Sequence, residues 1–331
     1  MGHCFCVPVE EADQYQQDVE PFPGRAGRGG PGGPGGAGGA GSSSRAASPK
    51  DQPLLFDGNN GERVERPTVH LEHGVKYVGQ WLGNVRDGHG VQVWPDGARF
   101  DGQWQNGLAE GYGKFVHADG DVYEGQWRDD KAHGEGTYFH QDGSRYQGQW
   151  LNDQKEGVAV EEWVDNSRFE GQYAAGKKHG TGKFSWPDGS RYEGQFVCNE
   201  IHGHGMYFWQ DGRVFNGQWK NNKMSGSGTF TWRDGRRYVG AYFGDKKDGK
   251  GVFTWPDGRE YDGEWQVGKQ HGTGVFKTAR GDLRTGEWKE GVRIRWISEA
   301  FRDDGKLPGG AKGAADPGAA KDEEGEEEMS A

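Results

Sequence analysis

The sequence predicts an all-β protein: an elongated, single-layer array of antiparallel β-hairpins with disordered tails at both ends. The first observation is that the pattern aromatic-x-Gly-x-aromatic recurs every 23 residues, a period typical of stacked supersecondary units. The second is an Asp-Gly turn signal that recurs in step with it. The third is that all 14 tryptophans lie between Trp81 and Trp296, which confines apolar packing to that part of the chain.

The copies of the repeat keep an unbroken spacing. Their first aromatic residues are Tyr77, Phe100, Tyr123, Tyr146, Phe169, Tyr192, Phe215, Tyr238 and Tyr261. A tenth, degenerate copy follows in register at Arg284–Trp288. We therefore predict one continuous repeat array over residues 71–297, because stacked repeats are not bound by the usual size limit of a core.

The segments outside the array contain no tryptophan. Residues 24–70 are rich in Gly, Ser and Pro, so we expect a disordered linker. Residues 298–331 end in an acidic run and are expected to form a disordered, solvated tail. The net charge of −11 argues against nucleic acid, which would require a basic surface.

One repeat illustrates how the sequence predicts a β-hairpin. From Gly134 to Trp150, glycines and aromatic residues alternate with polar ones, and Asp142-Gly143 supplies a turn between two runs. Because strand side chains alternate between faces, the Gly and aromatic residues share one face and the polar residues the other. Glycine on the aromatic face lets a neighbouring ring lie flat on the backbone.

No second layer is visible in the sequence, so the aromatic face is expected to curl into an open trough that binds a partner. The predicted trough residues are Trp127, Tyr138, Tyr146, Trp150, Glu161, Trp163, Phe169, Trp186, Tyr192, Trp209, Trp219 and Trp232.

The copy between Glu156 and Tyr173 departs from the pattern. Ala159 replaces a glycine, Glu161 replaces an aromatic residue of the aromatic face, and Asn166 replaces the turn glycine. Two interpretations stay open: a tolerated, weaker repeat, or a bend or partner site at which Glu161 meets a basic group.

These residues resemble the MORN (membrane occupation and recognition nexus) repeat family, whose repeat is built around Y-x-G-x-W, a Gly-x-Gly strand and an Asp-Gly turn. The resemblance covers about two thirds of the chain. It implies an antiparallel hairpin array that acts as a scaffold for protein partners, membranes or both. Some members carry lipid kinase or methyltransferase domains, but the flanking segments of this chain are short and low in complexity, so neither activity is expected.

The first residues resemble an N-myristoylation signal, with Gly2 as the acylated residue and Cys4 and Cys6 as palmitoylation candidates. Cys6 stands where the signal prefers Ser or Thr. One myristoyl chain binds membranes only marginally, and no Lys or Arg precedes Arg25, so the cysteines would have to supply the second signal. Residues 1–23 are thus predicted to be an acylated segment.

The sequence favours a non-enzymatic scaffold that tethers a protein partner to a cytoplasmic membrane face, with direct phospholipid binding left open. No group of nucleophile, base and orienting residue stands apart from the repeat, and no cofactor or metal site is expected. One alternative is a cytoskeletal or ciliary structural protein without lipidation. A third, of low weight, is a regulator of phosphoinositide kinase signalling. Three cysteines give no disulfide framework, which favours the cytosol.

Overall fold

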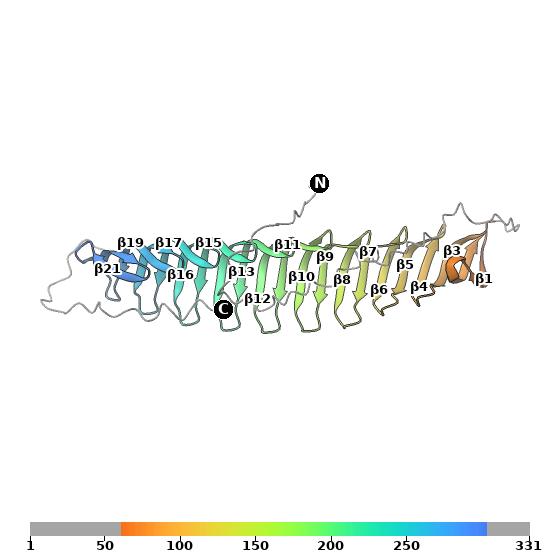
Figure 1. The fold of residues 1–331 in the computed structure, drawn as a ribbon, viewed down its shortest axis with the longest axis horizontal. Helices are drawn as coiled ribbons and strands as arrows, with labels where there is room; N and C mark the ends of the chain where they lie inside the picture. Colours follow the sequence, from red (N-terminus) through yellow and green to blue (C-terminus); the bar gives the residue numbers. More distant parts are fainter. Residues whose placement is uncertain (1–60, 303–331) are drawn as a thin grey trace. The chain divides into compact units, whose positions relative to one another are not determined.

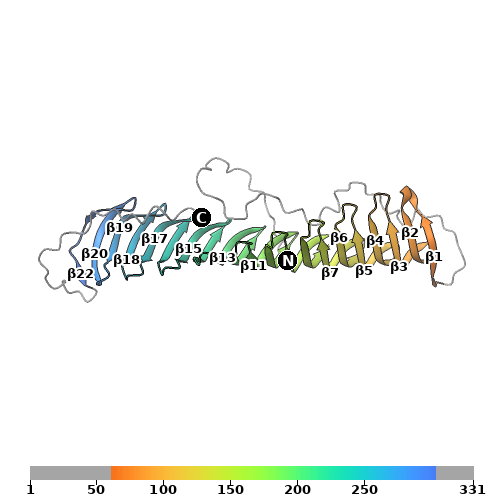
Figure 2. The same ribbon diagram turned by 90° about the horizontal axis from the view of Figure 1, so that it is seen from below.

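The computed structural model describes residues 61–302 and divides them into two compact units, residues 61–187 and residues 188–302. In each unit the strands follow one another in chain order, and each pairs antiparallel with its neighbours in sequence, except for the two-residue strand at Phe301–Arg302 (Figures 1 and 2). Helix is limited to a single 3₁₀ turn at Glu72–Gly74 among the residues the structure describes. The predicted all-β, single-layer antiparallel array is confirmed in both units.

The first unit is a meander of strands seven to nine residues long. Its strands are β1 (Arg63–His70), β2 (Lys76–Leu82), β3 (Val85–Val93), β4 (Arg99–Gln105), β5 (Leu108–Val116), β6 (Val122–Arg128), β7 (Lys131–Phe139), β8 (Arg145–Leu151), β9 (Gln154–Glu162), β10 (Arg168–Ala174) and β11 (Lys177–Ser185).

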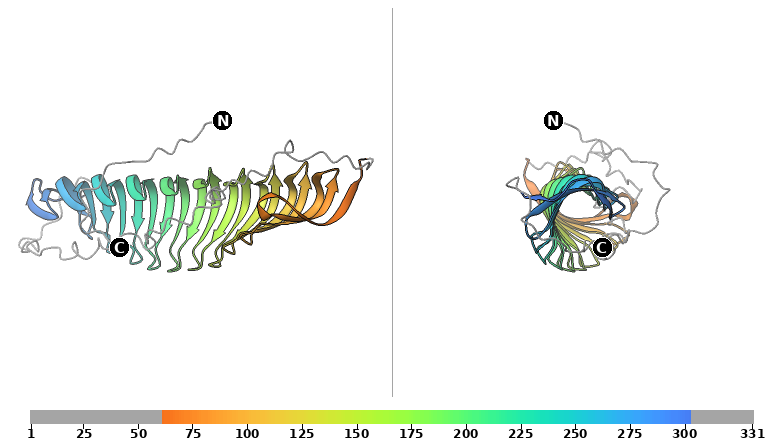
Figure 3. Two further views of the ribbon diagram at one scale, coloured as in Figure 1. Left: turned by 45° about the vertical axis from the view of Figure 1, so that its right-hand side comes forward. Right: turned by 90° about the vertical axis from the view of Figure 1, so that its left-hand side faces the viewer.

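The second unit repeats the same pattern and closes with shorter strands. Its strands are β12 (Arg191–Val197), β13 (Glu200–Phe208), β14 (Val214–Lys220), β15 (Lys223–Thr231), β16 (Arg237–Phe243), β17 (Lys246–Thr254), β18 (Glu260–Gln266), β19 (Lys269–Lys277), β20 (Asp282–Lys289), β21 (Val292–Trp296) and β22 (Phe301–Arg302). The sheet of each unit is strongly curved (Figure 3).

Each repeat carries a β-bulge that the sequence pattern encodes. Strand pairing shifts register between Gly125 and Trp127, which leaves the backbone N–H of Glu135 outside the ladder. The side-chain Oε1 of Gln126 accepts this N–H at 2.9 Å, and Gly134 supplies the positive φ of 61°. The same contact is made by Gln80, Gln103, Gln149, Gln172, Gln195 and Gln218. The glutamine in the repeat is therefore a structural residue.

Two kinds of turn join the strands. The Asp-Gly turn is closed by hydrogen bonds between His140 and Gly143 and between His140 and Ser144, and Gly143 has a φ of 96°. At the opposite ends of the strands, two-residue turns such as Asn152-Asp153 have positive φ at both residues, as type I′ turns require. The repeat pattern did not predict this second turn, because Asn, Asp, Gly, Ala and Cys all occur at its positions.

The aromatic face forms the core of each unit, even though the sheet has one layer. Tyr146 is fully buried, donates its hydroxyl to the backbone oxygen of Gln149 at 2.9 Å and meets the Trp150 ring edge-on. The Trp150 indole donates to the carbonyl of Gly136 at 3.1 Å. Both polar atoms of these rings are thus satisfied while the rings cover the glycine backbone.

Two predicted boundaries need correction. Residues 63–70 were expected to belong to the disordered linker, but they form β1, which pairs with β2 through Val64↔Trp81 and Val69↔Tyr77. Residues 301–302 were expected to lie in the disordered tail, but they form β22 and pair with β20. Both additions cover an edge of the array that would otherwise leave backbone groups of β2 or β20 unpaired.

Candidate binding surface

Most of the predicted trough residues are buried parts of the core. The buried ones are Tyr138, Tyr146, Trp150, Glu161, Phe169, Tyr192, Trp219 and Trp232. Only Trp127, Trp163, Trp186 and Trp209 are half-buried. The prediction of an open trough is therefore wrong for the rings that begin each repeat, because the next ring and the glycine backbone already cover them. A partner can reach the half-buried rings of Trp163, Trp186 and Trp209 near the Asp-Gly turns, and that of Trp127 near the two-residue turn Asp129-Asp130.

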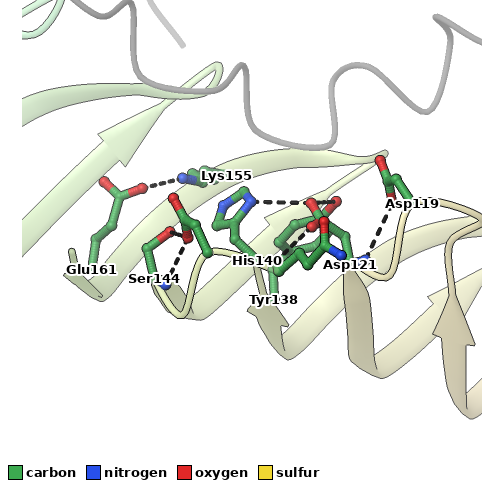
Figure 4. Close-up of polar contacts among 9 residues, drawn as sticks. Asp119, Asp121, Tyr138, His140, Ser144, Lys155 and Glu161 are labelled. Carbon is green, nitrogen blue, oxygen red and sulfur yellow. Dashed lines mark hydrogen bonds and ion pairs between the residues drawn. The ribbon is translucent and has the colours of Figure 1, made fainter. Parts of the chain in front are cut away.

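Glu161 does meet a basic group, but within its own chain (Figure 4). Its carboxylate pairs with the Lys155 ammonium, accepts the Tyr173 hydroxyl at 2.5 Å and lies 3.7 Å from the Lys178 nitrogen. Glu161 is 8% exposed and Lys155 is 5% exposed. The proposed partner contact at Glu161 is therefore not supported, since its charge is already neutralised.

The charges in this cluster perturb one another. Burial disfavours the ionised form of Glu161, but the attraction of Lys155 and Lys178 and the hydrogen bonds it accepts outweigh burial, so its pKa is lowered. Burial lowers the pKa of Lys178, and the attraction of Glu161 only partly offsets it. The Lys178 ammonium also lies 4.7 Å from the Trp163 ring centroid, which stabilises its charge.

The first repeat carries a similar polar substitution. Gln92 stands where most repeats have a ring, and Arg86, six residues earlier, donates a hydrogen bond to its side chain. The Arg86 guanidinium also lies 4.1 Å from the Trp104 ring centroid. In both repeats a polar residue at the ring position is matched by a basic residue six positions earlier, where neighbouring repeats have residues such as Ala109 and Ala132.

A second polar cluster lies on the aromatic face around Asp121 (Figure 4). Its carboxylate accepts hydrogen bonds from the Tyr138 hydroxyl at 2.8 Å and from the Gln141 N–H at 2.8 Å, and contacts His140 Nδ1 at 3.1 Å. Burial opposes ionisation of Asp121, but these interactions outweigh it and lower its pKa. Both carboxylate oxygens are occupied by the chain's own groups, so the cluster is structural.

The second unit presents a ladder of stacked rings on its aromatic face, which we call the ring ladder. Its ring contacts have centroid separations of 4.4 to 6.0 Å, the longest at its last step. The ladder comprises Tyr207, Trp209, Phe230, Trp232, Phe253, Trp255 and Phe276. Trp209, Trp255 and Phe276 are half-buried, so the ladder keeps accessible aromatic surface.

An arginine accompanies each tryptophan of the ladder. The guanidinium carbons of Arg213, Arg236 and Arg259 lie 5.4, 5.6 and 5.3 Å from the Trp209, Trp232 and Trp255 ring centroids. Each guanidinium also pairs with the aspartate of its turn, at 2.6 to 2.7 Å, in the pairs Arg213–Asp211, Arg236–Asp234 and Arg259–Asp257. The same Trp–Asp–Arg group thus recurs once per repeat along this edge.

Sequence reasoning missed these arginines because they do not alternate with the aromatic pattern. A signal was present: the residue after the Asp-Gly turn is Ser144, Ser167 and Ser190 in three consecutive repeats and Arg213, Arg236 and Arg259 in the next three. The tryptophan before the turn is present on both sides of this change, at Trp163 and Trp186 before the serines and at Trp209, Trp232 and Trp255 before the arginines. Gly2, Cys4 and Cys6, the predicted lipidation residues, lie outside the described residues.

Two further searches cover the described residues 61–302. No helix in this part of the chain is long and apolar enough to cross a membrane. No group of three or more His, Cys, Asp or Glu side chains in it is arranged to hold a metal ion.

Three solved structures illustrate the likenesses that a structural comparison finds, and all three are remote. The CPAP G-box domain is 14% identical, with 54% of this chain and 93% of that chain covered and a TM-score of 0.34. A mutant TCP10 domain of Danio rerio CPAP is 12% identical, with coverages of 70% and 99% and a TM-score of 0.25. The Drosophila melanogaster SAS-4 TCP domain in complex with a proline-rich motif of Ana2 is 11% identical, with coverages of 65% and 98% and a TM-score of 0.27. At these values the likenesses carry no functional argument.

Comparison with curated proteins finds no significant match. The MORN repeat model, in contrast, matches nine consecutive segments. They are residues 77–99, 100–122, 123–145, 146–168, 169–191, 192–212, 215–236, 238–258 and 261–283. Their starting points coincide with the aromatic residues that open each hairpin, and together they cover more than half of the chain. MORN repeats make a non-enzymatic, protein-binding type of scaffold, and this chain belongs to the MORN repeat family.

Proposed function

We propose that this protein is a scaffold that holds an extended segment of a protein partner along the ring ladder of residues 188–302. In this proposal an acylated N-terminus attaches the scaffold to a cytoplasmic membrane face. The protein itself performs no chemistry. Its contribution is to fix the partner's position relative to the membrane.

The observation that carries the partner site is the recurrence of accessible tryptophan and arginine along the ring ladder. Trp209 and Trp255 are half-buried, and the side chain of Arg213 keeps 23% of its surface exposed while it lies over Trp209. Tryptophan and arginine are the residues most enriched at the centres of protein interfaces. Large, preordered rings also lose little conformational entropy when a partner binds.

The spacing of the ladder suits an extended peptide. Successive tryptophans are one repeat apart, which is two strands or about 10 Å. Three residues of an extended chain also span about 10 Å. A partner segment with an apolar or aromatic residue at every third position would therefore place one such side chain on each repeat.

A selection from a random peptide library on the intact protein tests this proposal. Selected peptides should show the three-residue spacing, and Trp209→Leu with Trp255→Leu should weaken their binding at least about tenfold, the scale of one interface hot spot. The matched control is Phe243→Ala, which removes a 75% exposed ring from the opposite face. Peptides that respond to the control and ignore the tryptophan variants would overturn the proposed site.

The membrane attachment rests on the N-terminal residues. Gly2→Ala should block myristoylation and release the protein from membranes, because no acyl chain is then added. Cys4→Ser with Cys6→Ser should leave weak, reversible binding, since one myristoyl chain gives an affinity of only about 10⁴ per molar. If Gly2→Ala protein fractionates with membranes as fully as the wild type, acylation is not the anchor and a cytoskeletal role becomes the better explanation.

A further inference from the structure

The polar face of the second unit carries a line of lysines along one edge. They lie beside the two-residue turns, at the ends of β14, β15, β17, β19 and β20. We call them the lysine row: Lys220, Lys223, Lys246, Lys269 and Lys289. Lys220 and Lys223 are direct cross-strand partners, so two like charges face each other at this edge.

The lysine row is exposed and lacks ion pairs among the residues that the structure describes. Four of the five lysines are exposed and Lys246 is half-buried. The nearby carboxylates of Asp245 and Asp248 are engaged with the backbone, accepting the N–H groups of Met224 at 2.7 Å and Val267 at 3.1 Å. Asp245 attracts Lys223 and balances part of its charge, while the row as a whole presents positive charge to a ligand.

Charge is distributed unevenly along the chain. Residues 188–302 contain 19 basic and 15 acidic side chains, a net charge of +4. Residues 303–331, which follow directly, contain three basic and nine acidic side chains, a net charge of −6. Six of the acidic residues fall within seven positions, at Asp322, Glu323, Glu324, Glu326, Glu327 and Glu328.

We propose that the acidic segment 322–328 of this chain docks on its own lysine row. The ligand of the lysine row is thus a segment of the same chain, and it covers the row until a competing anionic surface displaces it. The proposal concerns the face opposite the ring ladder and does not depend on the proposed partner site.

The dimensions of segment and row agree. From Lys223 to Lys269 is two repeats, or four strand spacings, which is about 19 Å. Seven residues in an extended conformation span about 20 Å. An acidic segment running across the strand ends would thus place carboxylates near Lys223, Lys246 and Lys269.

The connection between the two is long enough. Asp322 lies 20 residues beyond Arg302, the last residue of β22. A random-coil chain of 20 residues would have a root-mean-square span of about 25 Å. β22 pairs with Asp282, at the end of β20 away from Lys289, so the path to β17 and β15 crosses three to five strands, about 15 to 25 Å, and also the length of β20, about 23 Å. The straight-line distance is then about 27 to 34 Å, which 20 residues with a fully extended length of about 66 Å can span. Tethering at this length gives an effective concentration of about 1 mM, which favours the chain's own segment over an acidic peptide in solution.

Lysine acetylation of the intact protein, followed residue by residue with mass spectrometry, tests the proposal. The test variant replaces the acidic residues by their amides: Asp322→Asn, Glu323→Gln, Glu324→Gln, Glu326→Gln, Glu327→Gln and Glu328→Gln. If the segment binds in trans with a dissociation constant of about 0.5 mM, the tether gives two-thirds occupancy, so the variant's lysine row should react about three times faster. About 1 M salt, which shortens the Debye length to about 3 Å, should raise the wild-type rates equally.

The first unit supplies matched control lysines. Lys131 and Lys177 occupy the same repeat position as Lys223, Lys246 and Lys269, and their reactivity should stay unchanged in the variant. Equal wild-type and variant rates on the lysine row would overturn the proposal, as would an equal rise at Lys131 and Lys177.

Zero-length carbodiimide crosslinking of a mixture of isotopically light and heavy protein identifies the occupant. Crosslinks from residues 322–328 to the lysine row should form within one chain, and crosslinks between chains would instead assign the row to a second copy. A wild-type row that is protected only when anionic vesicles are added would assign it to a membrane surface. Reversing the charges on both sides gives a last check. Lys223→Glu, Lys246→Glu and Lys269→Glu together should abolish the crosslinks. Adding lysines in place of the acidic residues of 322–328 to that variant should restore the protection of this edge from solvent, measured by hydrogen exchange.

Discussion

The buried cluster around Glu161 gives the sharpest prediction from this structure. Glu161→Ala would leave two ammonium groups, Lys155 and Lys178, near each other without their shared carboxylate. Both have side chains that are less than one fifth exposed, at 6% and 17%. Removing one partner of a buried ion pair costs about 3 to 5 kcal/mol, so we predict a loss of that size in the free energy of unfolding.

The repeat itself shows how to replace the cluster by an apolar core. The preceding repeat has Ala132 and Tyr138 at the equivalent positions, so the double variant Lys155→Ala with Glu161→Tyr copies a packing that the chain already uses. A hydroxyl partner is also present, because Ser144 stands where Ser190 accepts the Tyr207 hydroxyl at 3.2 Å. Buried ion pairs replaced by well-packed side chains are often neutral or stabilising by about 1 to 4 kcal/mol, so the double variant should be more stable than Glu161→Ala, with Lys178 keeping its contact with the Trp163 ring.

Urea unfolding of the full chain, followed by tryptophan fluorescence, measures both effects. The control is Glu162→Ala on the polar face, whose exposed carboxylate pairs with Arg145 and Arg168 and should change the midpoint little. If the double variant were as unstable as Glu161→Ala, the unpaired charge of Lys155 would not explain the loss. A single variant that costs less than the control would refute the electrostatic argument altogether.

Four further predictions concern pH and the repeat geometry. The pKa of Glu161 is lower in the folded protein than in the unfolded chain, where it is about 4.5. Its contribution to stability is therefore present above pH 4.5 and is lost as the pH falls through the folded pKa. Glu161→Gln should flatten the acid side of a curve of unfolding free energy against pH. Burial raises the pKa of Tyr77 to about 12. The contribution of the neutral Tyr77 hydroxyl to folding stability is therefore complete below pH 10 and should be lost as the pH rises toward 12. Ultraviolet titration of tyrosine, run alongside circular dichroism, measures this loss. Gly102→Ala would place a Cβ 2.5 Å from the Gly113 Cα and should markedly lower the melting temperature. Asp130→Ala removes the acceptor of the Ala109 N–H at 2.7 Å and should cost about 1 to 3 kcal/mol in urea unfolding, whereas a loss equal to that of the neighbouring Asp129→Ala would contradict a specific role.

The sequence alone determined the repeat, the hairpins and the division of each strand into two faces. A period of 23 residues with alternating glycine and aromatic residues permits only a strand geometry, and the Asp-Gly turns mark where one strand ends and the next begins. The same pattern placed Glu161 on the aromatic face. These conclusions depend on local periodicity, which a single sequence contains.

Only the tertiary structure decided which residues a partner could reach. Tyr146 and Trp209 are both aromatic residues of the same face, yet Tyr146 is fully buried and Trp209 is half-buried. The difference arises because Tyr146 is covered by the rings of Trp150 and Tyr173, the latter contributed by the next repeat. Burial depends on contacts between strands, and no feature of one repeat records it.

The charged neighbours of Glu161 are likewise set by the tertiary structure. Lys155 lies six residues before it on the same strand, where a regular strand would hold the two about 20 Å apart, and Lys178 lies 17 residues after it. The hairpin places Lys155 near it from the same strand across the bulge, and the following hairpin adds Lys178. A carboxylate that looks like an open binding residue in the sequence is therefore neutralised inside the fold, because charges meet according to the stacking of repeats and not according to their order in the chain.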